Sequence, residues 1–278
     1  MEKVMRFALV NNERSEAAPE LTGNCPGCSQ QMVARCGTQR VWHWAHRGSR
    51  NCDAWWEPET LWHRDWKYQF PSEWQEIIRH DEHGERHVAD VMTENGLVIE
   101  FQHSHLPLQE QAAREGFYRS MVWVVDGTRL KRDHHRFLDG RRVFRPTRLH
   151  GVFTTADPSG CFPSAWRDCS MPVFFDFRHS AGSAGTSTAS SEPLWCLLPG
   201  RAEGCAVVVA VSSATFVNAA RKWAWIIPVR AIMETVVATL RRERAIAERE
   251  ARSSIYGRPS YRKRKSRSFL NSPRRRRY

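Results

Sequence analysis

Apolar residues recur along the middle of the chain in patterns that predict alternating helices and strands. Trp62, Trp66 and Phe70 are spaced four residues apart and form one apolar helix stripe, which Pro71 ends. The later apolar runs are short and bounded by turn residues, as strands are. The predicted elements are a helix over 57–70, strands over 73–79, 86–92 and 97–102, a helix over 107–120 and a strand over 121–125. This order, α-β-β-β-α-β, indicates an α/β fold class.

The flanking parts of the chain have a different character. Residues 1–56 are rich in turn formers, and residues 131–235 contain the apolar runs 172–177 and 206–211, which predict a β-rich extension. Residues 228–252 predict an amphipathic helix. We therefore expect four segments, namely a metal-binding module over 1–56, a core over 57–130, the extension over 131–235 and a charged helix with a basic tail over 236–278.

Positive charge is concentrated at the carboxyl terminus. The formal net charge is +12, but residues 257–278 contain ten Lys or Arg and no acidic residue. Such a run favours binding to a polyanion such as DNA, with a solubilising tail as the alternative. The predicted DNA contacts in the tail are Arg262, Lys263, Arg264, Lys265, Arg274, Arg275, Arg276 and Arg277.

The opening residues lack the apolar run of a secretory signal, and no stretch is long and apolar enough to span a membrane. We therefore expect a cytoplasmic protein with no membrane partner.

Cysteine and histidine residues cluster near the amino terminus. Cys25 and Cys28 form a CxxC turn, and His43, His46 and Cys52 follow within 24 residues of Cys28. Thiolate and imidazole groups at this spacing are typical of a closed structural Zn²⁺ site with four ligands. We predict the ligands Cys25, Cys28, His46 and Cys52, with His43 as the substitute. The alternative is a chance CxxC among core residues.

Two carboxylates face each other on a predicted hairpin. If residues 94–96 form its loop, Val91 pairs with Ile99 and Asp90 with Glu100, which places both acids on the face that also carries Gln102. Opposed residues have Cβ atoms about 4.5–5.5 Å apart, where like charges repel. Oxygen ligands of this kind suit Mg²⁺ or Mn²⁺, so Asp90 and Glu100 are predicted ligands. A solvent-facing edge hairpin is the alternative.

A polar stripe on the first predicted helix supports the metal interpretation. Glu59, His63 and Lys67 are spaced four residues apart beside the Trp stripe. A solvated helix face with charge pairs explains this spacing equally well.

Several segments together resemble the competence protein CoiA-like family, whose core resembles the PD-(D/E)xK nuclease superfamily. The likeness covers residues 20–130 and is weaker around PVFFDF and LWCLLPGR. It is carried by CPGC…HWAH, by the helix with Glu59, His63 and Lys67, by ADV…IEFQxS, and by Arg114-Glu115…Tyr118 followed by VWVVDG.

The resemblance implies a restriction-endonuclease-like core that hydrolyses DNA phosphodiester bonds, in the handling of incoming or foreign DNA. It implies catalytic roles for Glu59, Asp90, Glu100 and Gln102, with Gln102 where a Lys is usual in the superfamily. Lys67 or Arg114 would bind the DNA and supply the positive charge that a Lys has and Gln102 does not.

The main alternative function is a catalytically inactive, zinc-stabilised nucleic-acid-binding protein. An HNH nuclease is a weaker alternative because the His-rich stretch lacks that motif's residue order, and a role of the tail helix at anionic surfaces ranks last.

Overall fold

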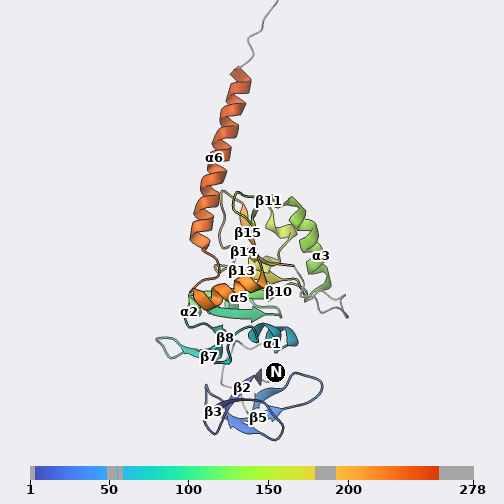
Figure 1. The fold of residues 1–278 in the computed structure, drawn as a ribbon, viewed down its shortest axis with the longest axis vertical. Coiled ribbons are helices and arrows are strands. Elements are labelled where there is room, and N and C mark those ends of the chain that lie inside the picture. Colours follow the sequence, from blue (N-terminus) through green and yellow to red (C-terminus); the bar gives the residue numbers. More distant parts are fainter. Residues whose placement is uncertain (1–3, 49–54, 56–58, 179–191, 257–278) are drawn as a thin grey trace, which may run out of the picture. The chain divides into compact units, whose positions relative to one another are not determined.

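The computed structural model describes residues 4–48, 55, 59–178 and 192–256 and shows two β-sheets with helices (Figure 1). By internal contacts the chain forms two units, Met1–Val237 and Ala238–Tyr278. Both sheets belong to the first unit, and the last helix, α6 (Val229–Tyr256), crosses the boundary. The fold is mixed α/β, as predicted; the division into four segments remains a prediction. Among the described helices, none combines the length and apolar character needed to cross a membrane.

The first sheet is formed by residues that the sequence patterns did not assign to strands. Its six strands follow the order β1-β6-β5-β4-β2-β3, with every pairing antiparallel. Met5, Ala8, Met32 and Trp44 form its buried core. Strands this short show little alternation, which explains why the sequence did not predict them. They are β1 (Val4–Met5), β2 (Phe7–Val10), β3 (Glu13–Glu16), β4 (Thr22–Asn24), β5 (Gln31–Arg35) and β6 (His43–His46).

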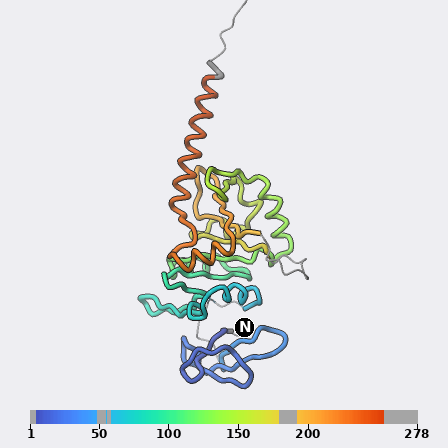
Figure 2. Tube along the Cα trace, viewed as in Figure 1, coloured from blue at the N-terminus to red at the C-terminus, as the bar shows by residue number. Residues whose placement is uncertain are grey.

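The second sheet has nine strands in the order β11-β12-β15-β14-β13-β10-β9-β8-β7, and its chain path can be followed in Figure 2. Strands β9, β10 and β13 run parallel, and the other neighbours are antiparallel. The strands are β7 (Gln75–His80), β8 (Arg86–Met92), β9 (Val98–Gln102), β10 (Met121–Asp126), β11 (Arg145–Pro146), β12 (Val152–Thr155), β13 (Val173–Asp176), β14 (Leu194–Leu197) and β15 (Ala206–Val211).

Helices cover both faces of this sheet. On β13, Phe174 packs against Phe216 of α5. On the opposite face Trp195 of β14, which pairs with Phe175, packs against Phe137 of α3. Burial on both faces explains why β10 and β13 are continuous apolar runs up to their final Asp residues. The helices are α1 (Leu61–Lys67), α2 (Leu108–Tyr118), α3 (Lys131–Gly140), α4 (Ser164–Arg167) and α5 (Ser213–Lys222), with 3-10 turns at Ser72–Trp74, Arg141–Val143 and Pro158–Gly160.

The predicted core order is present as α1-β7-β8-β9-α2-β10, with differences at the ends of elements. The largest difference is in α1, which begins at Leu61 rather than at residue 57. Thr60 caps it: its Oγ1 accepts from His63 N, and His63 Nδ1 accepts from Thr60 N. This reciprocal capping satisfies amide groups at the helix start, which explains the later beginning. Pro58 lies outside the described residues.

Buried Asp176 anchors α1 to the nine-stranded sheet. Its Oδ2 accepts hydrogen bonds from Trp62 Nε1 at 3.2 Å and Trp66 Nε1 at 2.9 Å. Arg178 binds the same carboxylate through Nε and Nη2, each at 2.8 Å. Burial raises the pKa of Asp176, but these partners, Arg178 foremost, bring it below its ordinary value. The Trp stripe predicted from the sequence therefore attaches α1 to β13, and so positions Lys67 at its end.

Candidate functional site

Lys67 lies among three carboxylates from different parts of the chain. Its Nζ is 3.1 Å from Asp90 Oδ1, 3.3 Å from Glu59 Oε1 and 3.4 Å from Glu76 Oε1. The side chain is almost fully buried. Burial lowers the pKa of Lys67, but the carboxylates, Asp90 foremost, raise it above its ordinary value. Lys67 is therefore a charged ammonium held inside the protein, so the polar stripe of α1 is not a solvated face.

Glu59 corrects part of the predicted stripe, because it precedes α1 instead of lying on it. Its carboxylate nevertheless reaches the helix: Arg64 Nε donates to Glu59 Oε2 at 2.7 Å, and Lys67 binds the other oxygen. Burial raises the pKa of Glu59, whereas Lys67 and Arg64 lower it, and the net pKa lies below its ordinary value. Glu59 thus stays ionised and positions the Lys67 ammonium.

Asp90 and Glu100 interlock across β8 and β9. The predicted pair Val91–Ile99 is confirmed, and the ladder assigned to these strands includes no Asp90–Glu100 pair. Instead, Phe101 N donates to Asp90 Oδ2 at 3.0 Å, and Asp90 N donates to Glu100 Oε1 at 3.3 Å. Each acid therefore binds a backbone amide of the opposite strand, which brings both carboxylates to the same point.

A buried arginine faces Glu100 from α2. Arg114 Nη1 donates to Glu100 Oε2 at 3.0 Å, and its Nη2 lies 2.5 Å from Glu110 Oε1. The side chain of Asp90 is 24% exposed, whereas those of Glu100 and Arg114 are 4% and 6% exposed. Burial raises the pKa of Asp90, but Lys67 and the Phe101 amide help to bring it below its ordinary value. Asp90 is thus ionised, and it is the more accessible acid of the pair.

Gln102 lies at the end of β9 and has one unsatisfied atom. Its Nε2 donates to the Ser104 carbonyl at 3.2 Å, whereas its Oε1 is buried without a hydrogen-bond partner among the described residues. A buried acceptor of this kind is normally satisfied by a water molecule or a ligand. Phe101 lies between Glu100 and Gln102 in the sequence, and its carbonyl oxygen is 3.1 Å from His63 Nε2 of α1.

Glu76 is a site residue that the sequence analysis missed. The pairs Gln75–Val91 and Ile77–Ala89 place it opposite Asp90 in the β7–β8 register, with a φ of 50°. Its carboxylate also accepts from the backbone amide of Arg6, at 2.8 and 2.9 Å. Extending the predicted β7–β8 hairpin register would have found it. Glu76, Asp90 and Glu100 thus follow one another on three neighbouring strands.

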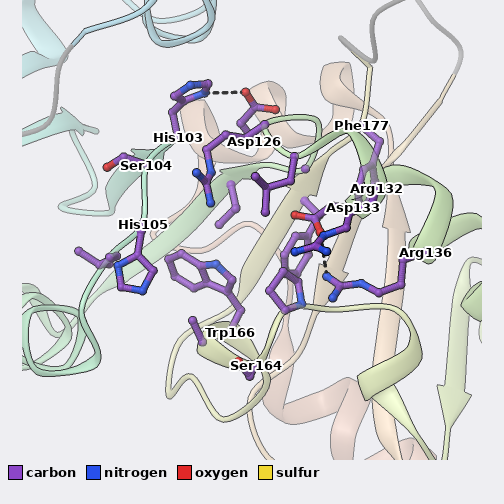
Figure 3. A pocket seen from close by; sticks show the side chains of 18 of the residues that line it. His103, Ser104, His105, Asp126, Arg132, Asp133, Arg136, Ser164, Trp166 and Phe177 are labelled. Carbon is purple, nitrogen blue, oxygen red and sulfur yellow. Dashed lines mark hydrogen bonds and ion pairs between the residues drawn. The ribbon is translucent and has the colours of Figure 1, made fainter.

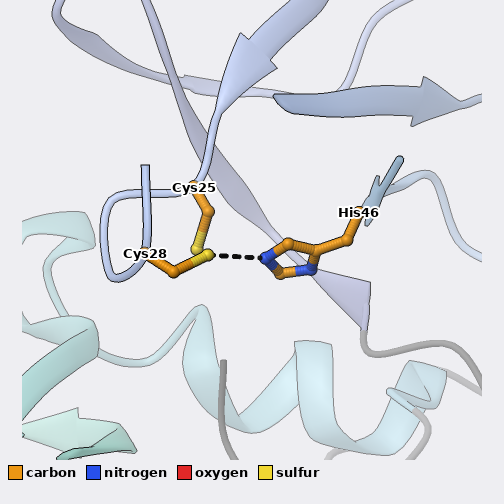
Figure 4. Close-up of side chains that lie close together, drawn as sticks. All are labelled: Cys25, Cys28 and His46. Carbon is orange, nitrogen blue, oxygen red and sulfur yellow. Dashed lines mark hydrogen bonds between the residues drawn. The ribbon is translucent and has the colours of Figure 1, made fainter. Parts of the chain in front are cut away.

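Cys25 and Cys28, in the turn between β4 and β5, come together with His46 at the end of β6 (Figure 4). Their ligand atoms all lie within 4.8 Å of one another, and Cys28 Sγ is 3.3 Å from His46 Nε2. Ligands of a tetrahedral Zn²⁺ site are separated by about 3.6 Å, given ordinary Zn–S and Zn–N lengths. Two thiols and an imidazole suit Zn²⁺, so the donor set fits a structural metal site.

The other predicted zinc ligands have different outcomes. Cys52 lies outside the described residues. His43 does not join the group, because it is paired with the Val41 carbonyl, 2.8 Å from its Nδ1. The tail arginines and lysines predicted to bind DNA, over 262–277, also lie outside the described residues.

Comparisons of the sequence with known proteins find one protein family and one relative that are similar to this chain. Residues 12–54, which contain the Cys25–Cys28–His46 group, match the family described as the N-terminal domain of competence protein CoiA. The chain is also 26% identical over 165 residues to competence protein CoiA of Bacillus subtilis (strain 168). That match covers 55% of this chain and 42% of the relative. No solved structure matches significantly. The two matches support the resemblance to the CoiA-like family that was predicted from the sequence, and the matched part spans less than half of the relative's length.

Proposed function

We propose that the chain is a metal-dependent nuclease that hydrolyses phosphodiester bonds of DNA, in the processing of incoming or foreign DNA. The observation that carries the proposal is the interlocked pair Asp90–Glu100 with Lys67 3.1 Å from Asp90. Two carboxylates and a lysine at one point are the groups that such a reaction needs. The competence name of the relative supports the proposed pathway.

The element order supports a restriction-endonuclease-like core of the PD-(D/E)xK type. Asp90 lies on the second strand of α1-β7-β8-β9-α2-β10, and Glu100 and Gln102 lie on the third. In this proposal Lys67, on the preceding helix, takes the role of the lysine that the superfamily usually has at the position of Gln102. Only 4% of the Lys67 surface is exposed. A DNA phosphate would therefore approach the Lys67 ammonium from the side of Asp90, which is partly exposed.

Asp90 and Glu100 would hold Mg²⁺ or Mn²⁺, which acidifies a bound water and neutralises charge on the phosphate. The chain's own groups would do the rest. Lys67 would place positive charge beside Asp90, and Glu59 would position Lys67 through its 3.3 Å contact. Gln102 Oε1, buried without a partner among the described residues, would accept a hydrogen bond from the attacking water. Arg114 would hold Glu100 in place.

The test is cleavage of plasmid, linear duplex and single-stranded DNA at low salt, with Mg²⁺ or Mn²⁺. Asp90→Asn and Glu100→Gln should each abolish cleavage. Glu94→Gln is the matched control, because Glu94 is exposed in the turn of the same hairpin. Thermal melting of each variant confirms that it folds. Cleavage that survives both site substitutions would overturn the proposal.

The ion pairs themselves favour a second candidate function. Lys67 and Arg114 neutralise Asp90 and Glu100 without a metal, as in a zinc-stabilised nucleic-acid-binding protein with an inactive core. In that case no DNA would be cut with either metal, and DNA binding would be the same in wild type, Asp90→Asn and Glu100→Gln. Loss of binding on truncation at residue 256 would then locate the DNA contacts in the tail.

A further inference from the structure

A pocket of about 240 Å³ lies beside the candidate nuclease site, at the carboxyl ends of β9 and β10 (Figure 3). Residues 103–106 border it after β9, and residues 125–127 border it at the end of β10. The start of α3 and the segment around α4 complete its wall. Carboxyl ends of parallel strands are the usual binding position in α/β sheets.

The pocket is adjacent to Gln102 by the strand register. Gln102 pairs with Val125 across the parallel β9–β10 ladder, so their side chains lie on the same face of the sheet. Val125 belongs to the pocket lining, and His103 directly follows Gln102. A ligand in the pocket would therefore lie next to the buried end of the candidate site.

The lining has an apolar part and a cationic part. Val125, Trp166 and Phe175 are buried and contribute apolar and aromatic surface. Arg129 and Arg132 line the same pocket and are exposed, as expected for groups at its mouth. The remaining guanidinium, from Arg136, is already paired with Asp133 at 3.2 Å.

The imidazole ring of His103 lies beside Asp126 at the edge of the pocket, on the side away from Arg132 and Asp133 (Figure 3). His103 Nδ1 is 2.7 Å from Asp126 Oδ2. The other oxygen of Asp126 accepts from Thr128 N at 2.8 Å and from Thr128 Oγ1 at 2.7 Å. The carboxylate is thus held on both sides, and it orients the histidine ring at the pocket edge.

We infer that this pocket binds a nucleoside monophosphate unit, with the base against Trp166 and the phosphate at Arg129 and Arg132. Flat aromatic ligands stack on indole rings, and guanidinium groups match phosphate oxygens. Pockets for small molecules measure about 300–1,000 Å³, so this pocket of about 240 Å³ is at the small end and suits one nucleotide rather than a longer strand. The nucleotide is either free or the terminal residue of a DNA strand. The strand-end source rests on the proposed nuclease function; nucleotide binding itself does not.

The test is calorimetric titration of the full chain with dAMP, deoxyadenosine and inorganic phosphate. We expect dAMP to bind at least tenfold more tightly than either fragment, because each fragment uses only half of the pocket. Arg129→Gln with Arg132→Gln should weaken dAMP binding at least tenfold and leave deoxyadenosine binding unchanged. Arg148→Gln, which removes an exposed arginine outside the pocket, should change neither.

A second variant fills the pocket without removing a core side chain. Ser164 lines the pocket and is exposed, so Ser164→Trp should abolish dAMP binding while the melting temperature stays within the range of wild type. Absence of dAMP binding, or binding that survives both Ser164→Trp and the double arginine substitution, would overturn the inference.

Competition identifies the source of the nucleotide. Displacement of dAMP by a short duplex with terminal phosphates, but not by the dephosphorylated duplex, indicates a strand end. Displacement by neither duplex indicates a free mononucleotide. Asp90→Asn and Glu100→Gln should keep dAMP binding, so failure of the nuclease proposal would leave this inference standing and its own failure would be visible separately.

Discussion

Lys67 Nζ lies 3.1 Å from Asp90 Oδ1, although the two residues belong to α1 and to the middle of β8. The contact is buried on the lysine side and partly exposed on the aspartate side. Two carboxylates behind Lys67, from Glu59 and Glu76, leave the cluster with more negative than positive groups. Arg64 also pairs with Glu59, so three carboxylates face two cations, and the remaining negative charge is in keeping with the cation site proposed above.

Removal of Lys67 should reveal that surplus. Lys67→Met leaves three acids without their shared cation, and breaking a buried ion pair costs about 3–5 kcal/mol of unfolding free energy. Urea unfolding with and without Mg²⁺ checks this, and Mg²⁺ should restore more stability to Lys67→Met than it adds to wild type. Lys222→Met, at an exposed position, should change stability by about 0.5 kcal/mol or less. Equal stability of the two variants would contradict the prediction.

Asp90 should contribute to the acid sensitivity of the protein. The ammonium of Lys67 and the Phe101 amide outweigh burial and hold the pKa of Asp90 below its ordinary value. Its stabilisation is therefore present above the unfolded pKa, about 3.9, and is lost as the pH falls from there toward the folded pKa. Unfolding free energies measured between neutral pH and pH about 3 should fall less steeply for Asp90→Asn than for wild type.

The control for this pH series is Asp168→Asn, whose parent side chain is 92% exposed. It should keep the wild-type slope. A slope for Asp90→Asn identical to that of wild type would show that Asp90 has the same pKa in the folded and unfolded chain.

Asp176 should be among the most sensitive positions for stability. Asp176→Ala leaves the indole N–H groups of Trp62 and Trp66 and the guanidinium of Arg178 without their acceptor. We expect a loss of about 3–5 kcal/mol, measured by urea unfolding followed by Trp fluorescence. Asp139→Ala removes an exposed ion pair with Arg142 and should cost less than 1 kcal/mol. Similar losses in both variants would contradict the anchoring role.

The zinc group should bind one metal ion per chain. Cys25→Ser and Cys28→Ser should each abolish zinc binding, measured by elemental analysis of the purified variant. Each variant should also melt at a lower temperature than wild type, because the metal stabilises the fold. Cys36→Ser is the control, because Cys36 does not belong to the group. Cys52→Ser tests the predicted fourth ligand and should weaken zinc binding. Zinc retained by Cys25→Ser would contradict the site.

Local patterns predicted the core elements well. The Trp stripe of α1, the strands β8 and β15 and the Val91–Ile99 pairing follow from periodicity and turn residues, which act between close neighbours in the chain. The six-stranded sheet was missed because strands of two to five residues carry too little alternation. Helices α3 and α5, inside the expected β-rich extension, were also missed.

The amino-acid sequence alone identified the metal-ligand spacing of Cys25, Cys28 and His46 and the acids Asp90 and Glu100, because motif and hairpin register are short-range properties. It did not show that Glu76 faces Asp90, that Lys67 joins three acids, or that Arg114 is buried against Glu100. Those contacts connect separate elements, and they depend on how α1 and α2 pack on the sheet. Long-range packing sets which buried charges meet, since each must find a partner once water is excluded.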